Sequence, residues 1–396
     1  MLILGSRGYR RAVSALCLGS VLVFANLYAI QPLLPTLAAE FELTALQASY
    51  SFSITTLTLG LSLLVYGGLS DALGRKPLMI GSLIGVVLTI VMLSQVRSYI
   101  DLMILRAVLG LFLGGLPAIA IAYMGDEFER PALIVAVGFY ISANTVGGIS
   151  GRLIGGFVGE WLGWSAVFMV MAGFSALLLA LFVVLLPNAQ RFSARPIHLG
   201  QILSDLYGHL RNPLILMACL IGGFNFFIFI NQYSYVTFLL AAPPYNLSSS
   251  WLGLLFLTYL TGTFGSAISG RVAQRIPQPL CMVLGIGILI LGSVTTLLPS
   301  LAGIVAGFFI SAFGLFFTQA TASSWVSQQA LQAKASASAL YLLSYYLGAT
   351  AGGFYLYPFW HWAAWQGVII GSIIVLLGTL SCAILLFMKT HRRVVT

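Results

Sequence analysis

Charged residues are scarce in this chain. Its 396 residues include 18 Lys and Arg and 9 Asp and Glu, which is 7% of the sequence, whereas soluble domains carry roughly 25%. So little charge cannot cover a globular surface in water, and the 60% of hydrophobic residues suits a surface that faces lipid. The composition therefore excludes an ordinary soluble domain and predicts an integral membrane protein.

Cysteine and histidine are also scarce, with 4 of each. The cysteines lie inside apolar runs, where they are typical of packing, and no Cys/His cluster has metal-ligand spacing. The chain also lacks H-E-x-x-H, other groupings of nucleophile and base within apolar runs, and the pore loops or charged rings of a channel. We therefore predict no metal and no cofactor, and neither an enzyme nor a channel.

Apolar runs long enough to cross a hydrocarbon core of about 30 Å are abundant. We count 12, six on each side of the longest polar stretch, 187–212, and they predict an all-α polytopic fold. The first run follows basic residues, as in a signal peptide, but it lacks a clear cleavage site and is predicted as a membrane helix. The predicted spans are 12–31, 47–66, 77–95, 102–124, 132–158, 164–186, 213–240, 250–270, 278–298, 302–326, 334–357 and 362–388.

Positive charge predicts how these spans are oriented. If the N-terminus is cytoplasmic, 15 of the 18 Lys and Arg fall on the cytoplasmic side, Arg97 falls outside, and Arg106 and Arg152 fall within the membrane. This asymmetry places both termini in the cytoplasm, and it explains the net charge of +9 without a nucleic-acid partner. The predicted domains are an N-terminal six-helix bundle (1–186), a cytoplasmic linker (187–212) with a short surface helix at 199–210, and a C-terminal six-helix bundle (213–396).

The two halves repeat one another. A shift of 201 residues superposes aromatic residues and glycines of the fifth and sixth spans on those of the last two, and a shift of 202 superposes Pro77-Leu78 on Pro279-Leu280. Because each half has an even number of spans, the repeat is parallel, as in transporters that work around a central site. The pairs at 201 are Tyr140/Tyr341, Gly147/Gly348, Gly151/Gly352, Trp161/Trp362 and Trp164/Trp365.

The segment GGLSDALGRKP, residues 67–77, follows the second span. A positively charged loop with turn glycines would explain its two basic residues, but not Asp71 at this spacing. The segment resembles the major facilitator signature G-x-L-a-D-r-x-G-r-k. The resemblance implies a fold of two six-helix bundles and a latch that closes the cytoplasmic side. The latch residues it implies are Gly67, Asp71, Gly74, Arg75 and Lys76, with Asp126 as a partner for Arg75, and Ala273 at the position equivalent to Asp71 confines the latch to one half.

A glycine pattern in the fifth span resembles the signature G-(x8)-G-(x3)-G-P-(x2)-G-G of drug and metabolite exporters in this family. Such glycines also let two helices pack closely, so packing alone is an open alternative. Arg152 replaces the usual proline, removes its hinge and places a positive charge in the membrane. It either attracts an anionic substrate group at the central interface, or pairs with a backbone carbonyl or with Glu160. The pattern consists of Gly138, Gly147, Gly151, Arg152, Gly155 and Gly156.

A second arginine, Arg106, begins the sequence RAVLG in the fourth span, which is similar to the family pattern R-x-x-q-G. A charge within a membrane helix usually faces a cavity or a partner. Arg106 is only about one turn deep, however, so its side chain could also extend to the outer interface. Both interpretations stay open.

In the family, the first, fourth, seventh and tenth helices line the substrate cavity. Polar side chains on these helices either face the cavity or hold helices together, because buried amides need hydrogen-bond partners. Gln31 and Gln232 lie 201 residues apart and are expected to flank the cavity symmetrically. The predicted cavity residues are Asn26, Tyr28, Gln31, Arg106, Arg152, Asn225, Asn231, Gln232, Gln319 and Trp325.

No Asp or Glu lies in the middle of a predicted span, where cation-specific multidrug pumps usually place a carboxylate. We therefore expect a secondary transporter that exports small neutral or anionic amphipathic molecules by alternating access, with protons, carried by Asp126 or by the substrate, as the exchange partner. Import of a small organic metabolite is the alternative. The segments NLYAIQPLLP (26–35) and LYLLSYYLG (340–348) look like those of bacterial transporters near the arabinose-efflux and drug:proton antiporter groups. This resemblance implies the bacterial inner membrane. We also expect contact with lipid and a functional monomer.

Overall fold

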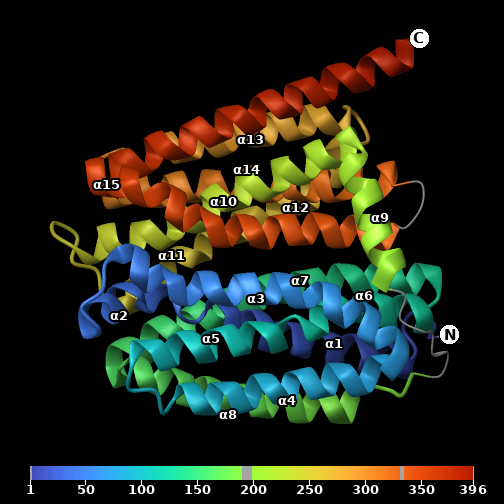
Figure 1. Cartoon of the computed structure of the whole chain (residues 1–396), viewed down its shortest axis with the longest axis horizontal. Coiled ribbons are helices and arrows are strands. Elements are labelled where there is room, and N and C mark those ends of the chain that lie inside the picture. The colour runs from blue at the N-terminus through green and yellow to red at the C-terminus, as the bar shows by residue number, and fades with distance from the viewer. Residues whose placement is uncertain (1, 190–198, 331–333, 396) are drawn as a thin grey trace. The chain divides into compact units, whose positions relative to one another are not determined.

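The computed structural model describes residues 2–189, 199–330 and 334–395. Within these ranges the regular structure is helical, apart from an isolated parallel bridge between Leu2 and Phe128 (Figure 1). The predicted all-α fold is thus confirmed. By their contacts the residues form two compact units, Met1–His198 with Leu247–Leu254, and Leu199–Asn246 with Leu255–Thr396.

The first unit contains the whole of the predicted N-terminal bundle, 1–186. Its fourth predicted span consists of two helices, which meet at Gly114. The elements of this unit are α1 (Arg7–Tyr28), η1 (Gln31–Leu33), α2 (Leu34–Glu40), α3 (Ala45–Leu73), α4 (Arg75–Leu93), α5 (Tyr99–Leu113), α6 (Gly115–Glu127), α7 (Arg130–Leu162), α8 (Trp164–Leu185) and most of α11 (Ser249–Leu255).

The second unit begins with the helix that was predicted within the linker. This helix, α9, runs from Leu199 to Arg211, against a prediction of 199–210. The other elements are α10 (Pro213–Ala241), η2 (Phe256–Thr258), α12 (Tyr259–Val272), α13 (Gln278–Thr295), α14 (Leu301–Gln329) and α15 (Lys334–Val395).

In the described ranges, 11 helices or runs of helices are long and apolar enough to cross a membrane. The last of them, Ser336–Thr390, contains both of the last two predicted spans. Ala363 and Ala364 interrupt it with non-helical backbone angles. Tyr355 Oη donates to Gly371 O at 3.1 Å, so the chain folds back at this break, as Figure 1 shows for α15. The break lies just beyond the gap 358–361 between the last two predicted spans, because the helix continues through Pro358.

Single glycines join α3 to α4 and α7 to α8. Gly74 has a φ of 101° and Gly163 a φ of 86°, a region in which a side chain would be strained. Gly74 therefore permits a one-residue connection and places Arg75 at the first position of α4.

The contact units differ from the predicted domains in two places, since the second unit begins at Leu199, within the predicted linker, and Leu247–Leu254 belongs to the first unit. Leu247–Leu254 lies between α10 and α12 in the chain, yet it belongs to the first unit. Residues 190–198, in the middle of the predicted linker, lie outside the described residues. The boundaries 1–186, 187–212 and 213–396 stay a prediction.

Candidate functional site

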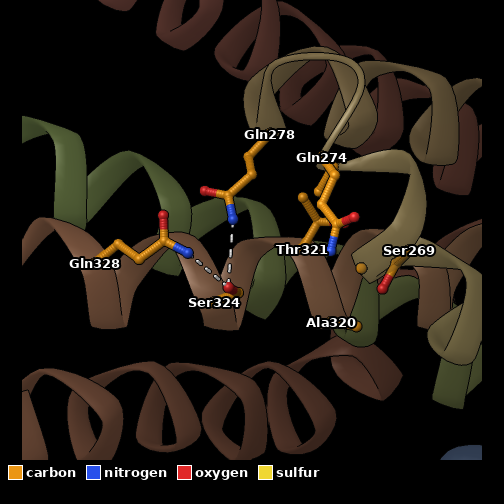
Figure 2. Close-up of a pocket in the computed structure, with 9 residues that line it drawn as sticks. Ser269, Gln274, Gln278, Ala320, Thr321, Ser324 and Gln328 are labelled. Carbon is orange, nitrogen blue, oxygen red and sulfur yellow. Dashed lines mark hydrogen bonds between the residues drawn. The ribbon is translucent and has the colours of Figure 1, made fainter.

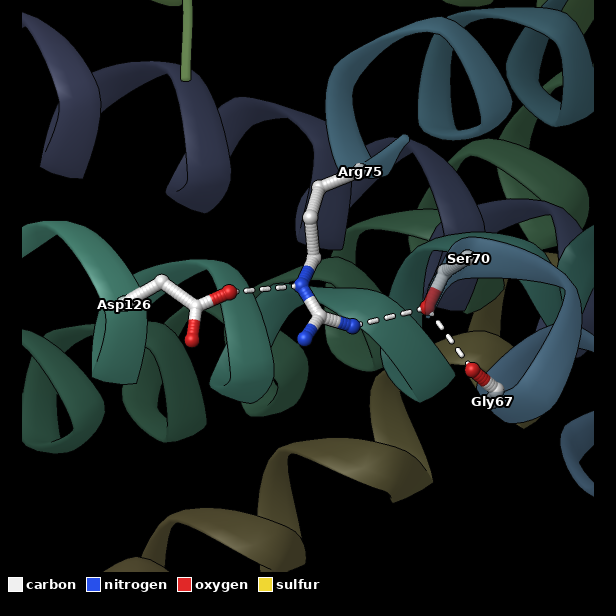
Figure 3. Close-up of polar contacts among 4 residues, drawn as sticks. All are labelled: Gly67, Ser70, Arg75 and Asp126. Atoms are coloured by element: carbon white, nitrogen blue, oxygen red, sulfur yellow. Dashed lines mark hydrogen bonds and ion pairs between the residues drawn. The ribbon is translucent and has the colours of Figure 1, made fainter. Parts of the chain in front are cut away.

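Arg75 connects the signature segment to α6 (Figure 3). Its Nε donates to Asp126 Oδ2 and its Nη1 to Ser70 Oγ, both at 2.8 Å. Ser70 Oγ donates in turn to Gly67 O at 2.8 Å. The side chain of Arg75 is 13% exposed and that of Asp126 is 38% exposed. We therefore expect this ion pair to contribute at most about 1 kcal/mol to the stability of the fold. The side chain of Asp71 lies outside the described residues, and the latch stays a prediction.

Lys76 connects the same segment to the residues that follow α8. Its Nζ donates to Leu186 O at 2.6 Å and to Asn188 Oδ1 at 2.9 Å. Tyr123 Oη of α6 donates to Pro187 O at 3.1 Å. The beginning of the predicted linker is thus held by two helices of the first unit, which the sequence pattern did not predict.

An uncharged counterpart of this junction lies in the second unit. With the shift of 202, Lys76 corresponds to Gln278 and Asp126 to Gln328. Both glutamine Nε2 atoms donate to Ser324 Oγ, at 3.3 and 3.1 Å (Figure 2). The sequence carries no distinctive signal for this site, because its polar residues are uncharged. A cavity of about 460 Å³ here is lined by Ser269, Gly270, Ala273, Gln274, Gln278, Ala320, Thr321, Ser324 and Gln328.

Three glycines of the fifth-span pattern lie where α7 meets α1. A Cβ added at Gly147, Gly151 or Gly155 would lie 2.8, 2.1 and 2.1 Å from Val21 O, Ala25 O and Ala29 O, respectively. No larger residue fits there, because the obstacle is backbone. Gly138 has open space at the same position, so it takes no part in this contact.

Gly156 of the same pattern faces α11 instead. A Cβ at Gly156 would lie 2.5 Å from Ser249 O. Glu160, one turn further along α7, accepts hydrogen bonds from Ser248 Oγ at 2.6 Å and from Ser250 N at 3.0 Å. The pattern therefore gives α7 two glycine surfaces, one for α1 and one for α11, and Glu160 binds the beginning of α11.

Arg152 is completely buried. Its Nε donates to Gln31 Oε1 at 2.7 Å, and its Nη1 donates to Gly148 O at 3.1 Å. Its guanidinium carbon lies 3.9 Å from the centroid of the Tyr28 ring. Three predicted cavity residues, Tyr28, Gln31 and Arg152, therefore form one cluster. The carbonyl partner considered as an alternative is also present, in Gly148.

Arg106 is also completely buried and does not extend to an interface. Its Nε donates to Ser51 O at 3.0 Å, its Nη1 to Asn26 O at 3.3 Å and its Nη2 to Leu27 O at 3.2 Å. These carbonyls belong to α3 and to the last turn of α1, where the helix leaves its own carbonyls unpaired. Arg106 of α5 therefore connects α5 to α1 and α3 through hydrogen bonds. Its contact with a substrate stays a prediction.

Three of the predicted cavity amides hold helices together. Asn26 Nδ2 donates to Leu22 O at 2.8 Å and to Ser175 Oγ of α8 at 2.7 Å. Asn231 Nδ2 donates to Phe227 O at 2.9 Å and to Ala349 O of α15 at 3.0 Å, and Gln232 Nε2 donates to Ser293 Oγ of α13 at 3.1 Å. These contacts support the structural alternative for Asn26, Asn231 and Gln232.

Four other cavity predictions each keep a buried atom that has no hydrogen-bond partner among the described residues. Asn225 Oδ1 accepts from Thr379 Oγ1 at 2.8 Å. The atoms without a partner are Gln31 Nε2, Asn225 Nδ2, Gln319 Oε1 and Trp325 Nε1. Buried polar atoms are rarely left unpaired, so these four are the strongest candidates for contact with a ligand or water.

Metal ligands do not gather in the described part of the chain. No group of three or more His, Cys, Asp or Glu residues within the described ranges is placed to hold a metal ion. Cys17, Cys219, Cys281 and Cys382 are free thiols.

Comparison with known proteins agrees with the fold. The MFS-type transporter YybF of Bacillus subtilis (strain 168) is 35% identical over 92% of this chain and 90% of its own length. The inner membrane transport protein YnfM of Escherichia coli (strain K12) is 34% identical over 98% of this chain and 92% of its own. The multidrug resistance protein MdtG of Citrobacter koseri is 27% identical over 53% of this chain and 52% of its own.

A solved structure has the same fold. The crystal structure of a bacterial homologue of the human lysosomal transporter Spinster, inward-facing and unoccupied, superposes with a TM-score of 0.74 over 96% of both chains, at 18% identity. The family model described as Major Facilitator Superfamily matches residues 16–353. The match covers most of the chain and agrees with the signature segment, so the chain belongs to the Major Facilitator Superfamily of membrane transporters, which are not enzymes.

Proposed function

We propose that the chain exports small neutral or anionic amphipathic organic molecules by alternating access, with protons as the exchange partner. The observation that carries this proposal is the packing of α7 on α1 through Gly147, Gly151 and Gly155. These glycines belong to a pattern typical of exporters, and they act together at one surface. The name of MdtG, a multidrug resistance protein, supports export as well.

The distribution of charge supports the substrate class. The middle of each predicted span lacks Asp and Glu, whereas Arg152 adds a positive charge within α7. A buried positive charge favours anionic groups and disfavours cations. We therefore propose neutral or anionic substrates rather than lipophilic cations.

We also propose an orientation in the membrane and a functional unit for this chain. The distribution of Lys and Arg supports two cytoplasmic termini, and the similarity to YnfM supports the inner membrane. A monomer is proposed as the functional unit. Asp126 is bound to Arg75, so uptake of a proton there would break that ion pair.

The experiment compares cells that produce the wild type, Asp71→Asn and, as a control far from the signature segment, Asp101→Asn. Levels of a broad panel of metabolites and drugs are followed inside and outside the cells, with and without a protonophore. If the chain is an exporter, cells with the wild type or Asp101→Asn lose specific compounds, and a protonophore prevents this loss. Cells with normal amounts of Asp71→Asn do not lose these compounds.

Other outcomes are equally informative. Accumulation of a compound in wild-type cells would make the chain an importer and would remove the exporter interpretation of the α7 glycines. Full activity of Asp71→Asn would remove the latch.

A further inference from the structure

Gln31 presents a buried donor that lacks an acceptor. Its Oε1 accepts from Arg152 Nε at 2.7 Å, whereas its Nε2 has no hydrogen-bond partner among the described residues. The side chain is 0% exposed. An unpaired buried N–H is destabilising, so the geometry calls for an acceptor that the surrounding protein does not supply.

The charge beside this donor indicates which acceptor fits. Arg152 is also 0% exposed, and its contacts with Gln31 Oε1, Gly148 O and the Tyr28 ring are with neutral groups. A guanidinium and an adjacent N–H suit the two oxygens of a carboxylate, which forms short, charge-assisted hydrogen bonds. We propose that Gln31 and Arg152 bind the carboxylate of an organic substrate. This assignment deepens the proposed function, on which it rests.

The equivalent glutamine of the second half shows what a purely structural role looks like. Gln232 Nε2 donates to Ser293 Oγ at 3.1 Å, and Ser293 Oγ lies 3.4 Å from Gln232 Oε1. The residue that corresponds to Arg152 at the shift of 201 is Gly353. Gln232 thus has partners for both amide atoms and no arginine beside it, so of these two equivalent glutamines the one with the unpaired donor is the one beside the charge.

The carboxylate site is enclosed in this conformation, so a ligand enters when a neighbouring segment moves. Helix α11 lies against the same turns of α7. A Cβ at Gly253 would lie 2.8 Å from Arg152 O, and Gly156 meets Ser249 in the same way. Glycine has no side chain that could interdigitate across this contact. The hydrogen bonds that Glu160 accepts from Ser248 and Ser250 are the main polar contacts described between α7 and the beginning of α11.

The test measures equilibrium binding of benzoate and of benzamide, its neutral isostere, to the purified protein in lipid nanodiscs. The wild type is expected to bind benzoate at least about tenfold more tightly than benzamide. Arg152→Gln is expected to remove this preference. Gln31→Glu supplies a carboxylate of its own, so it is expected to lower benzoate affinity at least about tenfold and to raise the Tm. Gln232→Glu is the matched control, and it is expected to keep the preference for benzoate.

Two results overturn the site. One is equal binding of benzoate and benzamide by the wild type, or binding of neither. The other is a Gln31→Glu variant whose Tm falls and which still binds benzoate. Because this result does not depend on Arg152→Gln, it tests the site even if Arg152→Gln does not fold. Failure of the proposed function is a separate result: a protein that prefers benzoate but accumulates compounds in cells keeps the carboxylate site and loses export.

Discussion

The two junctions at corresponding places in the halves differ in charge. In the first unit Arg75 binds Asp126, whereas in the second unit Gln278 and Gln328 both bind Ser324. Both junctions connect the beginning of one helix to the end of another through side chains. One of them depends on an ion pair that salt weakens, and the other depends on neutral hydrogen bonds.

In contrast to the junctions, the glycine contacts between α7 and α1 and between α15 and α10 are alike. A Cβ at Gly151 would lie 2.1 Å from Ala25 O in the first unit, and a Cβ at Gly352 would lie 2.2 Å from Phe227 O in the second. The repeat therefore preserves small residues where two backbones touch and varies the polar groups around them. Close helix packing leaves no room for a side chain at these glycines, whereas a buried charge is costly, and the second half has Gly307 and Gly353 at the positions of Arg106 and Arg152.

The largest expected effect tests the shared glycine contacts. Gly151→Leu and Gly352→Leu each force a side chain into backbone, so each should destabilise its half by more than about 3 kcal/mol. Size-exclusion chromatography and Tm measurements on the solubilised protein would show aggregated or unstable material for both. Gly138→Leu, in open space, should resemble the wild type. Tolerance of one substitution but not of the other would contradict the equivalence of the two contacts.

The next largest effect concerns Arg106, whose position at the shift of 201 is occupied by Gly307. Arg106→Met should destabilise the protein by about 3 kcal/mol, because the carbonyls of Asn26, Leu27 and Ser51 each lose a charged donor. Thermal unfolding of the purified variant measures this loss. An unchanged Tm, together with weaker substrate binding, would assign Arg106 to the cavity instead.

A smaller effect on stability but a clear effect on transport is expected for Asp126→Asn. The partly exposed ion pair with Arg75 contributes at most about 1 kcal/mol, so the Tm should fall by only a few degrees. Transport should fall more, because the variant breaks the connection between the signature segment and α6. Transport assays at matched protein levels check this, and wild-type rates in Asp126→Asn would remove Arg75–Asp126 from the latch.

The smallest effect is expected for the neutral junction. Gln328→Leu removes one hydrogen bond to Ser324 at an exposed position, so it should cost about 1 kcal/mol or less. Its Tm difference from the wild type should not depend on salt, in contrast to that of Asp126→Asn. A salt titration of both variants makes the comparison, and equal salt dependence would show that the Arg75–Asp126 ion pair adds no electrostatic stability.

The sequence predicted the membrane helices well because lipid requires every spanning segment to be apolar and to satisfy its own backbone. It also singled out Tyr28, Gln31 and Arg152 separately, but their contact depends on how α1 and α7 face one another. It missed the Gln278–Ser324–Gln328 junction, since uncharged residues near a helix end carry no distinctive pattern. The break between the last two spans lies just beyond the predicted gap 358–361, because a helix can continue through proline when its other backbone hydrogen bonds remain.

By itself, the sequence determined the fold class, the number of membrane-crossing stretches, the parallel repeat and the family, because each of these depends on hydropathy or on spacing along one helix. Only the tertiary structure decided that Arg106 clamps carbonyls of α1 and α3, that Arg152 lies on Tyr28 beside an unpaired Gln31 donor, and that Leu247–Leu254 belongs to the first unit. The physical reason is that a buried polar group is defined by its partners, and those partners come from segments far apart in the chain.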